Sequence, residues 1–259
     1  MFTNVYLLWQ FTKRDIQGRY RGSMLGLGWT VLSPLLLLSV FTLVFYGFFK
    51  FKWPVAATGV AQVDFALQVY VGLTLFNLFA EVVGRAPTLI TSQPNLVTKV
   101  AFPLPVLAVS ATLSAAFQAA ISLGLLMLVA TVLTTPHWSW LAIPLLMLLL
   151  TLLMAGVALW LAALGVYLRD LVPLVGLLTS LMMFLSPVFY PISTVPERWQ
   201  ALYRLNPLAL LITEMRQVLF NGAWPHWQSL ALLSVVTLVL AGSGSWLFQR
   251  LRGGFADVL

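Results

Sequence analysis

The polar side chains best able to act on a ligand lie inside apolar stretches, at the spacing of a helix. They form three sets with intervals of three or four residues, namely Tyr70, Thr74, Asn77 and Glu81; Ser39, Thr42 and Tyr46; and Thr179, Met183, Ser186 and Tyr190. Residues at such intervals share one helix face. Hydroxyl groups on one face can bond neighbouring helices, or several such faces can line a path with a mild, uncharged surface. The sequence leaves both interpretations open.

Glu81 is the one acidic residue well inside an apolar stretch, which makes it a functional candidate. Arg85 follows four residues later, so a local ion pair is the simpler interpretation. No lysine follows a glycine, so the sequence has no G-x-x-x-x-G-K-[ST] phosphate-binding loop, and it also lacks H-E-x-x-H and G-x-S-x-G. We therefore predict no catalytic residue and no cofactor bound by this chain. His137 and His226 have no cysteine or carboxylate nearby in the sequence, so no metal site is predicted.

Composition places these residues in a membrane. The chain has 259 residues, of which 61% are hydrophobic and 8% charged, against about 25% charged in a typical soluble domain. No Asp, Glu, Lys or Arg occurs between Lys99 and Arg169. The net charge of +7 is interpreted as a signal of orientation and lipid contact, because no soluble module is present to bind nucleic acid. Without cysteine there is no thiol chemistry, and the redox compartment stays undecided.

Uncharged runs predict an all-α polytopic membrane protein with six transmembrane helices. They lie at 29–49, 65–84, 104–133, 141–166, 171–190 and 228–248. Six spans place both termini on one side, and most of the 14 lysines and arginines then fall in the N-terminal side's loops. The positive-inside rule therefore predicts cytoplasmic termini.

The N-terminal segment, 1–22, predicts an amphipathic interface helix that lies in the membrane plane. On a helical wheel its polar face carries Gln10, Lys13, Arg14 and Gln17. Asp15 and Arg19 interrupt the apolar face. The helix is expected to anchor on the lipid surface, and a docking role for its basic side is an added interpretation.

Two further segments are not simple spans. Segment 85–103 has four prolines and a short helix from Asn95 to Lys99, and is expected to contact a soluble partner in the cytoplasm. Segment 187–226 predicts two short helices separated at Asn206–Pro207 and ended by Asn221–Gly222. The second helix is too short to span a membrane, so we expect a re-entrant or interfacial hairpin on the outer side that either closes a pathway or packs over the bundle.

Two long stretches and one short one carry a family resemblance. They are RDIQGRYRGSMLGLGWTVLSPL (Arg14 to Leu35), SPVFYPISTVPERWQALYRLNPLALLITEMRQVLFNG (Ser186 to Gly222) and NLVTKVAFP (Asn95 to Pro103). The sequence resembles the permease subunits of ABC-2 type polysaccharide and polyol-phosphate exporters, the O-antigen, teichoic-acid and capsule group. It departs from their usual pattern at Gly28, before Trp29, and at Leu104–Pro105, after Phe102–Pro103.

The resemblance implies a six-span homodimer in the bacterial cytoplasmic (inner) membrane that exports a lipid-linked polysaccharide. Two nucleotide-binding ATPase subunits, which carry ATP and Mg, would dock beneath it, and periplasmic export components are further expected partners. Alternatives are an exporter of the same architecture for drugs or small lipids, and a membrane enzyme acting on lipid-linked sugars, for which Glu81 is the intramembrane acid.

The same resemblance implies roles for individual residues. Those expected to couple to the ATPase are Trp9, Lys13, Arg14, Arg19, Gln93, Asn95 and Lys99. Those expected to line the conduit are Ser39, Thr42, Tyr46, Thr179, Met183, Ser186 and Tyr190, and those expected in a periplasmic gate at 187–226 are Pro187, Pro191, Asn206, Pro207 and Glu214.

Overall fold

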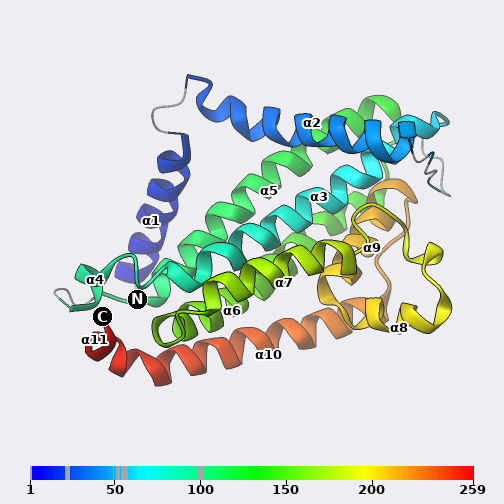
Figure 1. Ribbon diagram of the computed structural model, residues 1–259. Helices are drawn as coiled ribbons and strands as arrows, with labels where there is room; N and C mark the ends of the chain where they lie inside the picture. The colour runs from blue at the N-terminus through cyan, green and yellow to red at the C-terminus, as the bar shows by residue number, and fades with distance from the viewer. Residues whose placement is uncertain (1, 21–23, 49, 51–52, 54–57, 99–101) are drawn as a thin grey trace.

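The computed structural model describes residues 2–20, 24–48, 50, 53, 58–98 and 102–259, and these residues form helices without any strand (Figure 1). Five helical stretches are long and apolar enough to cross a membrane. They contain α2 (Trp29–Phe41, continued by a π-helix at Thr42–Phe48), α3 (Ala61–Arg85), α5 (Pro105–Leu133), α6 (Ile143–Tyr167) and α10 (Trp227–Leu251). Helix α7 (Leu171–Leu185) is equally apolar but shorter. The protein is therefore an all-helical membrane protein with five or six candidate spans.

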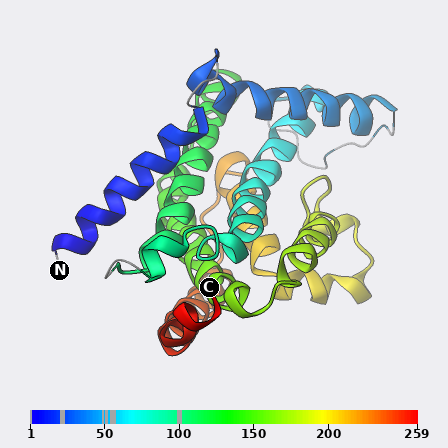
Figure 2. The same ribbon diagram turned by 60° about the vertical axis from the view of Figure 1, so that its left-hand side comes forward.

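Shorter helices lie at the two ends of this bundle (Figure 1). One end carries both chain termini together with α4 (Pro94–Thr98) and α11 (Phe255–Val258), and the opposite end carries α8 (Glu197–Leu205) and α9 (Pro207–Phe220). Helix α1 (Phe2–Tyr20) leans against α5, on the side of the bundle away from α7 (Figure 2). The chain turns from α1 into α2 near Gly26, whose positive φ of 47° suits glycine.

Helix α7 ends earlier than the sequence predicts. The expected span reached residue 190, whereas the helix stops at Leu185 and Ser186 has extended backbone angles of φ −110° and ψ 143°. The cause is Pro187, because a proline disfavours the helical conformation of the residue before it. Ser186 and Tyr190 therefore do not continue the helical face of Thr179 and Met183, and that part of the prediction is wrong.

The core of the bundle is built around α3 and α6. Most of α3 is buried, and α10 lies alongside α6. A Cβ atom on Gly156 would come within 2.6 Å of the backbone nitrogen of Ala241, so a side chain there would force the two helices apart. The indole Nε1 of Trp160 donates a hydrogen bond of 3.1 Å to the Ser243 hydroxyl across the same contact. Small residues thus set the α6–α10 distance, as in other membrane helix pairs.

Apolar side chains cover the outside of α2, α7 and α10. Exposed examples are Leu32, Leu35, Leu36, Leu177, Leu181, Val235 and Leu238. Such a surface suits lipid or another protein chain, not water.

Candidate functional site

Four charged residues form a closed network where α1 meets α3. Arg19 contacts Glu81 on α3 and lies 3.4 Å from Asp15 on its own helix. Arg85 lies 2.5 Å from Asp15 and 3.3 Å from Glu81, measured between guanidinium nitrogens and carboxylate oxygens. Each acid thus contacts both arginines. We call Asp15, Arg19, Glu81 and Arg85 the ionic ring.

The ionic ring confirms the predicted Glu81–Arg85 pair and extends it. No partner for Asp15 and Arg19 could be predicted from the sequence, and their only signal was that they interrupt the apolar face of α1. That interruption has a physical reason, because the apolar side of α1 faces the bundle and only paired charges are tolerated there. The four side chains are between 23% and 37% exposed, so they are partly shielded from water.

Burial raises the pKa of the Asp15 carboxyl, but hydrogen bonds and charge from Arg85, with a smaller contribution from Arg19, outweigh burial and hold that pKa below its usual value. Asp15 therefore stays ionised through the physiological pH range, and the ring keeps its alternating charges.

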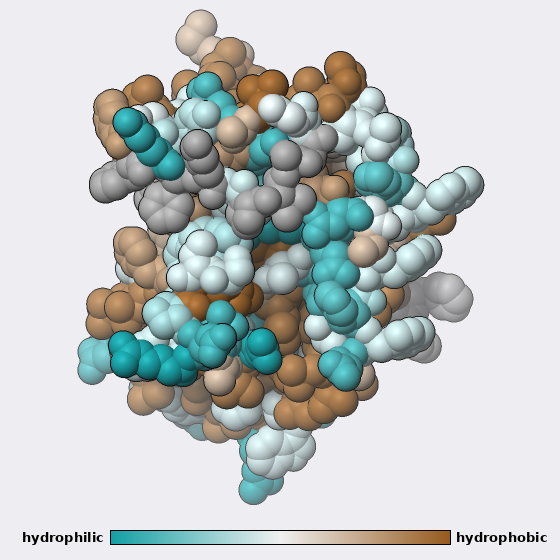
Figure 3. Space-filling model, turned by 90° about the vertical axis from the view of Figure 1, so that its right-hand side faces the viewer, coloured by the Kyte–Doolittle hydropathy of each residue, from teal (hydrophilic) through white to brown (hydrophobic). Residues whose placement is uncertain are grey.

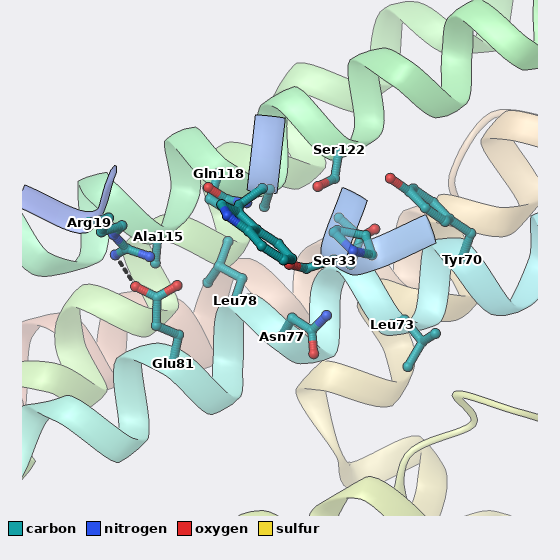
Figure 4. A pocket seen from close by; sticks show the side chains of 14 residues that line it. Arg19, Ser33, Tyr70, Leu73, Asn77, Leu78, Glu81, Ala115, Gln118 and Ser122 are labelled. Atoms are coloured by element: carbon teal, nitrogen blue, oxygen red, sulfur yellow. Dashed lines mark hydrogen bonds and ion pairs between the residues drawn. The ribbon is translucent and has the colours of Figure 1, made fainter. Parts of the chain in front are cut away.

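A polar cavity of about 360 Å³ lies directly beside the ring, between α2, α3 and α5 (Figure 4). Its polar lining comes from these three helices and from α1, and consists of Arg19, Ser33, Tyr70, Thr74, Asn77, Glu81, Gln118 and Ser122. The set Tyr70, Thr74, Asn77 and Glu81 therefore does share one face, and that face lines a cavity. Leu73, Leu78 and Ala115 add apolar surface.

A second, more open hollow of about 660 Å³ lies on the other side of the ring. Arg14, Asp15, Gly18 and Arg85 line it, and Arg19 and Glu81 line both the hollow and the cavity. The two spaces thus adjoin at the Arg19–Glu81 pair.

The other two polar sets do not reach this cavity. The Ser39 hydroxyl is exposed and donates 2.8 Å to the Leu35 carbonyl, whereas Thr42 is buried. Tyr46 packs near the Phe65 ring, and the Thr179 hydroxyl donates 2.8 Å to the Val175 carbonyl. Their predicted role as conduit lining, and that of Met183, Ser186 and Tyr190, stays a prediction.

The segment after α7 is tied to α8 and α9 by hydrogen bonds. Tyr190 donates its hydroxyl hydrogen to the Phe184 carbonyl and pairs with the Tyr203 hydroxyl at 2.7 Å. Asn206 donates to the Leu185 carbonyl and to Ser186 Oγ, both at 3.2 Å. The side-chain Oδ1 of Asn206 also accepts from the Leu208 backbone amide at 3.0 Å, so this residue caps α9. Asn206 and Pro207 are two of the predicted gate residues. Because Asn206 is the cap of α9 and Pro207 is its first residue, they determine how α8 joins α9.

Arg216 on α9 connects three segments at the end of the bundle that carries α8 and α9. The sequence places it on the polar face of α9, but it is 7% exposed. Its guanidinium donates to the carbonyls of Gln68 at 3.0 Å, Pro187 at 2.5 Å and Val188 at 2.7 Å. It also lies over the Trp53 ring, 4.5 Å from the centroid. No spacing in the sequence indicated this site, because its acceptors are backbone carbonyls.

The same end of the bundle has a pocket of about 190 Å³ that Trp53, Gln68 and Arg216 help to line. Figure 3 shows this end, where hydrophilic side chains gather around a hollow. Prolines shape the nearby backbone, with Pro191 in an extended conformation before the turn at Ile192–Thr194.

Glu214 is 3% exposed. Its carboxylate accepts a hydrogen bond of 3.0 Å from the backbone amide of His226 and lies 3.1 Å from Nδ1 of the His226 ring. The expectation that His226 has no carboxylate partner is therefore wrong, because α9 folds back onto the start of α10. Within the described residues no three or more His, Cys, Asp or Glu side chains gather as metal ligands.

The residues expected to couple to an ATPase divide into two groups. Trp9 is 64% exposed, and Lys13, Arg14 and Asn95 are also exposed, while Gln93 is half-buried. Arg14 stacks on Phe11, 4.2 Å from the ring centroid. Arg19 instead points inward to the ionic ring, and Lys99 lies outside the described residues.

Residues 6–220 match the model of the ABC-2 type transporter family. The chain belongs to the ABC-2 type transporter family. It is 30% identical to the O-antigen export system permease protein RfbA of Myxococcus xanthus, over 97% of this chain and 94% of that protein. An O-antigen export system permease protein RfbA of Klebsiella pneumoniae is 26% identical over 98% of this chain and 95% of that protein. Membership of this family makes the chain a multi-pass transport subunit of the inner membrane, and the family's ATPase is a separate subunit.

Proposed function

We propose that this chain is the membrane subunit of an ATP-driven exporter that moves a lipid-linked polysaccharide of the O-antigen type across the inner membrane. The observation that carries this proposal is the similarity to two O-antigen export permeases over nearly the whole length of both chains. The hydroxyl-and-amide lining of the cavity agrees with a carbohydrate cargo, because sugar hydroxyls need partners that both donate and accept hydrogen bonds.

The exporter is proposed to contain two copies of this chain. The cavity of about 360 Å³ is in the range of small-molecule sites, roughly 300–1,000 Å³, and is too small for a polysaccharide. A continuous conduit then needs a second copy. The exposed apolar faces of α2 and α7 are available to meet it, which would place Ser39 and Thr179 beside the path.

The partner ATPase is proposed to dock at the end of the bundle that carries both termini and α4, on the cytoplasmic side. The exposed ring of Trp9 and the exposed cation of Lys13 support this placement, since large aromatic and basic side chains are common anchors in protein interfaces. Periplasmic export components would meet the opposite end, near α8 and α9.

Deletion of the gene tests the proposed function. We expect loss of surface polysaccharide with lipid-linked glycan retained on the inner side, and rescue by this chain. Purification in mild detergent should recover an ATPase subunit with it. Unchanged surface polysaccharide in the deletion strain would refute the export role.

A docking test uses Trp9→Ala and Lys13→Ala, with Arg204→Ala on α8 as an exposed control at the opposite end. The first two variants should recover less ATPase, whereas the control should recover the normal amount. Equal recovery from all three would remove α1 from the docking surface.

A further inference from the structure

The polar cavity and the second, more open hollow meet at the ionic ring. Because Arg19 and Glu81 line both spaces, a ligand that enters the cavity from the hollow must pass their ion pair. We infer that the cavity binds the phosphorylated sugar head group of the lipid-linked glycan, and that the ionic ring is its inner closure. The inference rests on the proposed function and names a binding step within it.

The cavity lining suits a sugar. Asn77 and Gln118 each present an amide that donates and accepts, and the hydroxyls of Ser33, Thr74 and Ser122 do the same. Figure 4 shows Asn77 and Ser122 on opposite sides of the space, so a ligand between them is met from α3 and α5. Trp29 supplies an aromatic surface and Leu78 an aliphatic one, which suit the C–H faces of a sugar ring. The cavity volume suits one sugar head group and is too small for a polysaccharide chain.

Arg19 supplies the contact for a phosphate. Its Nη2 contacts Glu81, but its Nε is buried and has no hydrogen-bond partner within the described residues. A buried N–H donor without an acceptor is unfavourable by about 1–3 kcal/mol, so a phosphate oxygen at this position would satisfy it. Arginine also presents its donors in a fork that matches phosphate geometry.

The ring can exchange partners without leaving a charge unpaired. Glu81 contacts both Arg19 and Arg85, so if a phosphate takes Arg19, Glu81 keeps Arg85. Asp15 likewise keeps its 2.5 Å contact with Arg85. Opening the ring therefore replaces one carboxylate at Arg19 with a phosphate, and no ion is left buried alone.

The test uses the absence of cysteine from the sequence. Ser122→Cys places a single thiol in the cavity, and Ala256→Cys, on an exposed position of α11 at the end of the bundle that carries both termini, is the control. Both variants are prepared with the ATPase subunit in inverted membrane vesicles, from cells that make the glycan and from cells that lack its first sugar transferase. The probe is the water-soluble reagent 2-sulfonatoethyl methanethiosulfonate.

We expect Cys modification at position 122 in glycan-free vesicles and protection by the glycan. At a ligand concentration ten times its Kd, one-site occupancy lowers the modification rate about tenfold. Glu81→Gln should raise the rate because it weakens the closure. Modification at position 256 should not respond to the glycan. Equal rates at position 122 with and without glycan, or no modification even with Glu81→Gln, would overturn the inference.

Glucose 1-phosphate added to glycan-free vesicles separates two sources of the head group. If glucose 1-phosphate does not protect the thiol at position 122, the site is assigned to a lipid-linked head group. If it protects that thiol as well as the glycan does, the ligand is a free sugar phosphate and the lipid-linked ligand is overturned. As a second measurement, Asn77→Leu and Gln118→Leu should lower export while the ATPase is still recovered. If these variants export normally and the gene deletion still abolishes surface polysaccharide, the cavity site fails and the export function stands.

Discussion

Gly72 on α3 is the position where one added methyl group gives the clearest test of how α3 packs against Arg216 on α9 and the segment after α7. A Cβ there would lie 2.7 Å from Arg216 Nη2 and 2.8 Å from the Val188 carbonyl oxygen. Overpacking of this kind destabilises by about 1–3 kcal/mol, while alanine gains about 1 kcal/mol over glycine inside a helix. Gly72→Ala is therefore expected to lower the free energy of unfolding by up to about 2 kcal/mol, the steric effect less the propensity gain.

Gly84→Ala is the matched control, because Gly84 lies on the same helix and an added Cβ meets nothing within 4 Å. Gly84→Ala gains the helix propensity without the steric effect. The difference in the free energy of unfolding between the two variants is therefore the steric effect alone, about 1–3 kcal/mol. For a chain of this size that corresponds to roughly 2–12 °C in Tm.

The assay is thermal unfolding of the purified exporter, this chain together with its ATPase subunit, in one detergent. Unfolding is followed by tryptophan fluorescence at a fixed scan rate. Both variants are measured beside the parent chain. A Tm for Gly72→Ala equal to or above that of Gly84→Ala would show that the guanidinium and the Val188 backbone move aside freely. The proposed tight connection between α3, α9 and the segment after α7 would then be refuted.

Three further outcomes follow from the contacts described above. Glu81→Gln removes the charge that faces Arg19 and should lower both thermal stability and ATP-dependent export; if both are untouched, the ionic ring has no role. The lowered pKa of Asp15 means that its contribution to stability is present above the ordinary carboxyl pKa and is lost as the pH falls through the lower folded-state pKa. Stability measured from pH 6 down to 3 should therefore fall more steeply for the parent than for Asp15→Asn, and parallel curves would contradict the assignment. Tyr190→Ala removes the hydrogen bond to Tyr203 and should change export or permeability while the ATPase is still recovered; unchanged transport and leak would remove Tyr190 from the conduit lining.

The fold class could be predicted from the sequence because membrane helices depend on long uncharged runs. The stretch without charge between Lys99 and Arg169 is long enough to require more than one helix, and α5 and α6 lie within it. The end of α7 was missed because composition stays apolar through Val188 and Phe189, while the backbone breaks at Pro187 for a local steric reason.

The candidate site was predictable only in part, and the difference depends on how local each contact is. The face of Tyr70, Thr74, Asn77 and Glu81 follows from spacing on one helix. The pairing of Asp15 with Arg85 joins residues 70 positions apart, and the contact of Arg216 with the Gln68 carbonyl spans 148. Such contacts depend on how helices pack, which a single sequence does not record.

Helix α3 connects the two halves of this chemistry. Glu81 and Arg85 tie its C-terminal end to α1, and near its N-terminal end the Gln68 carbonyl accepts from Arg216 on α9. The 25 residues of α3 form a rod with a rise of about 1.5 Å per residue, and most of its length is packed against other helices. If α1 shifts and Glu81 moves with it, α3 must move as well, and the movement reaches Arg216. If α3 stays in place, the contacts of the ionic ring must break. Because α1 also bears the surface proposed for ATPase docking, a pull on that surface would act on the ring, where it would either move α3 or release Arg19 to the cavity.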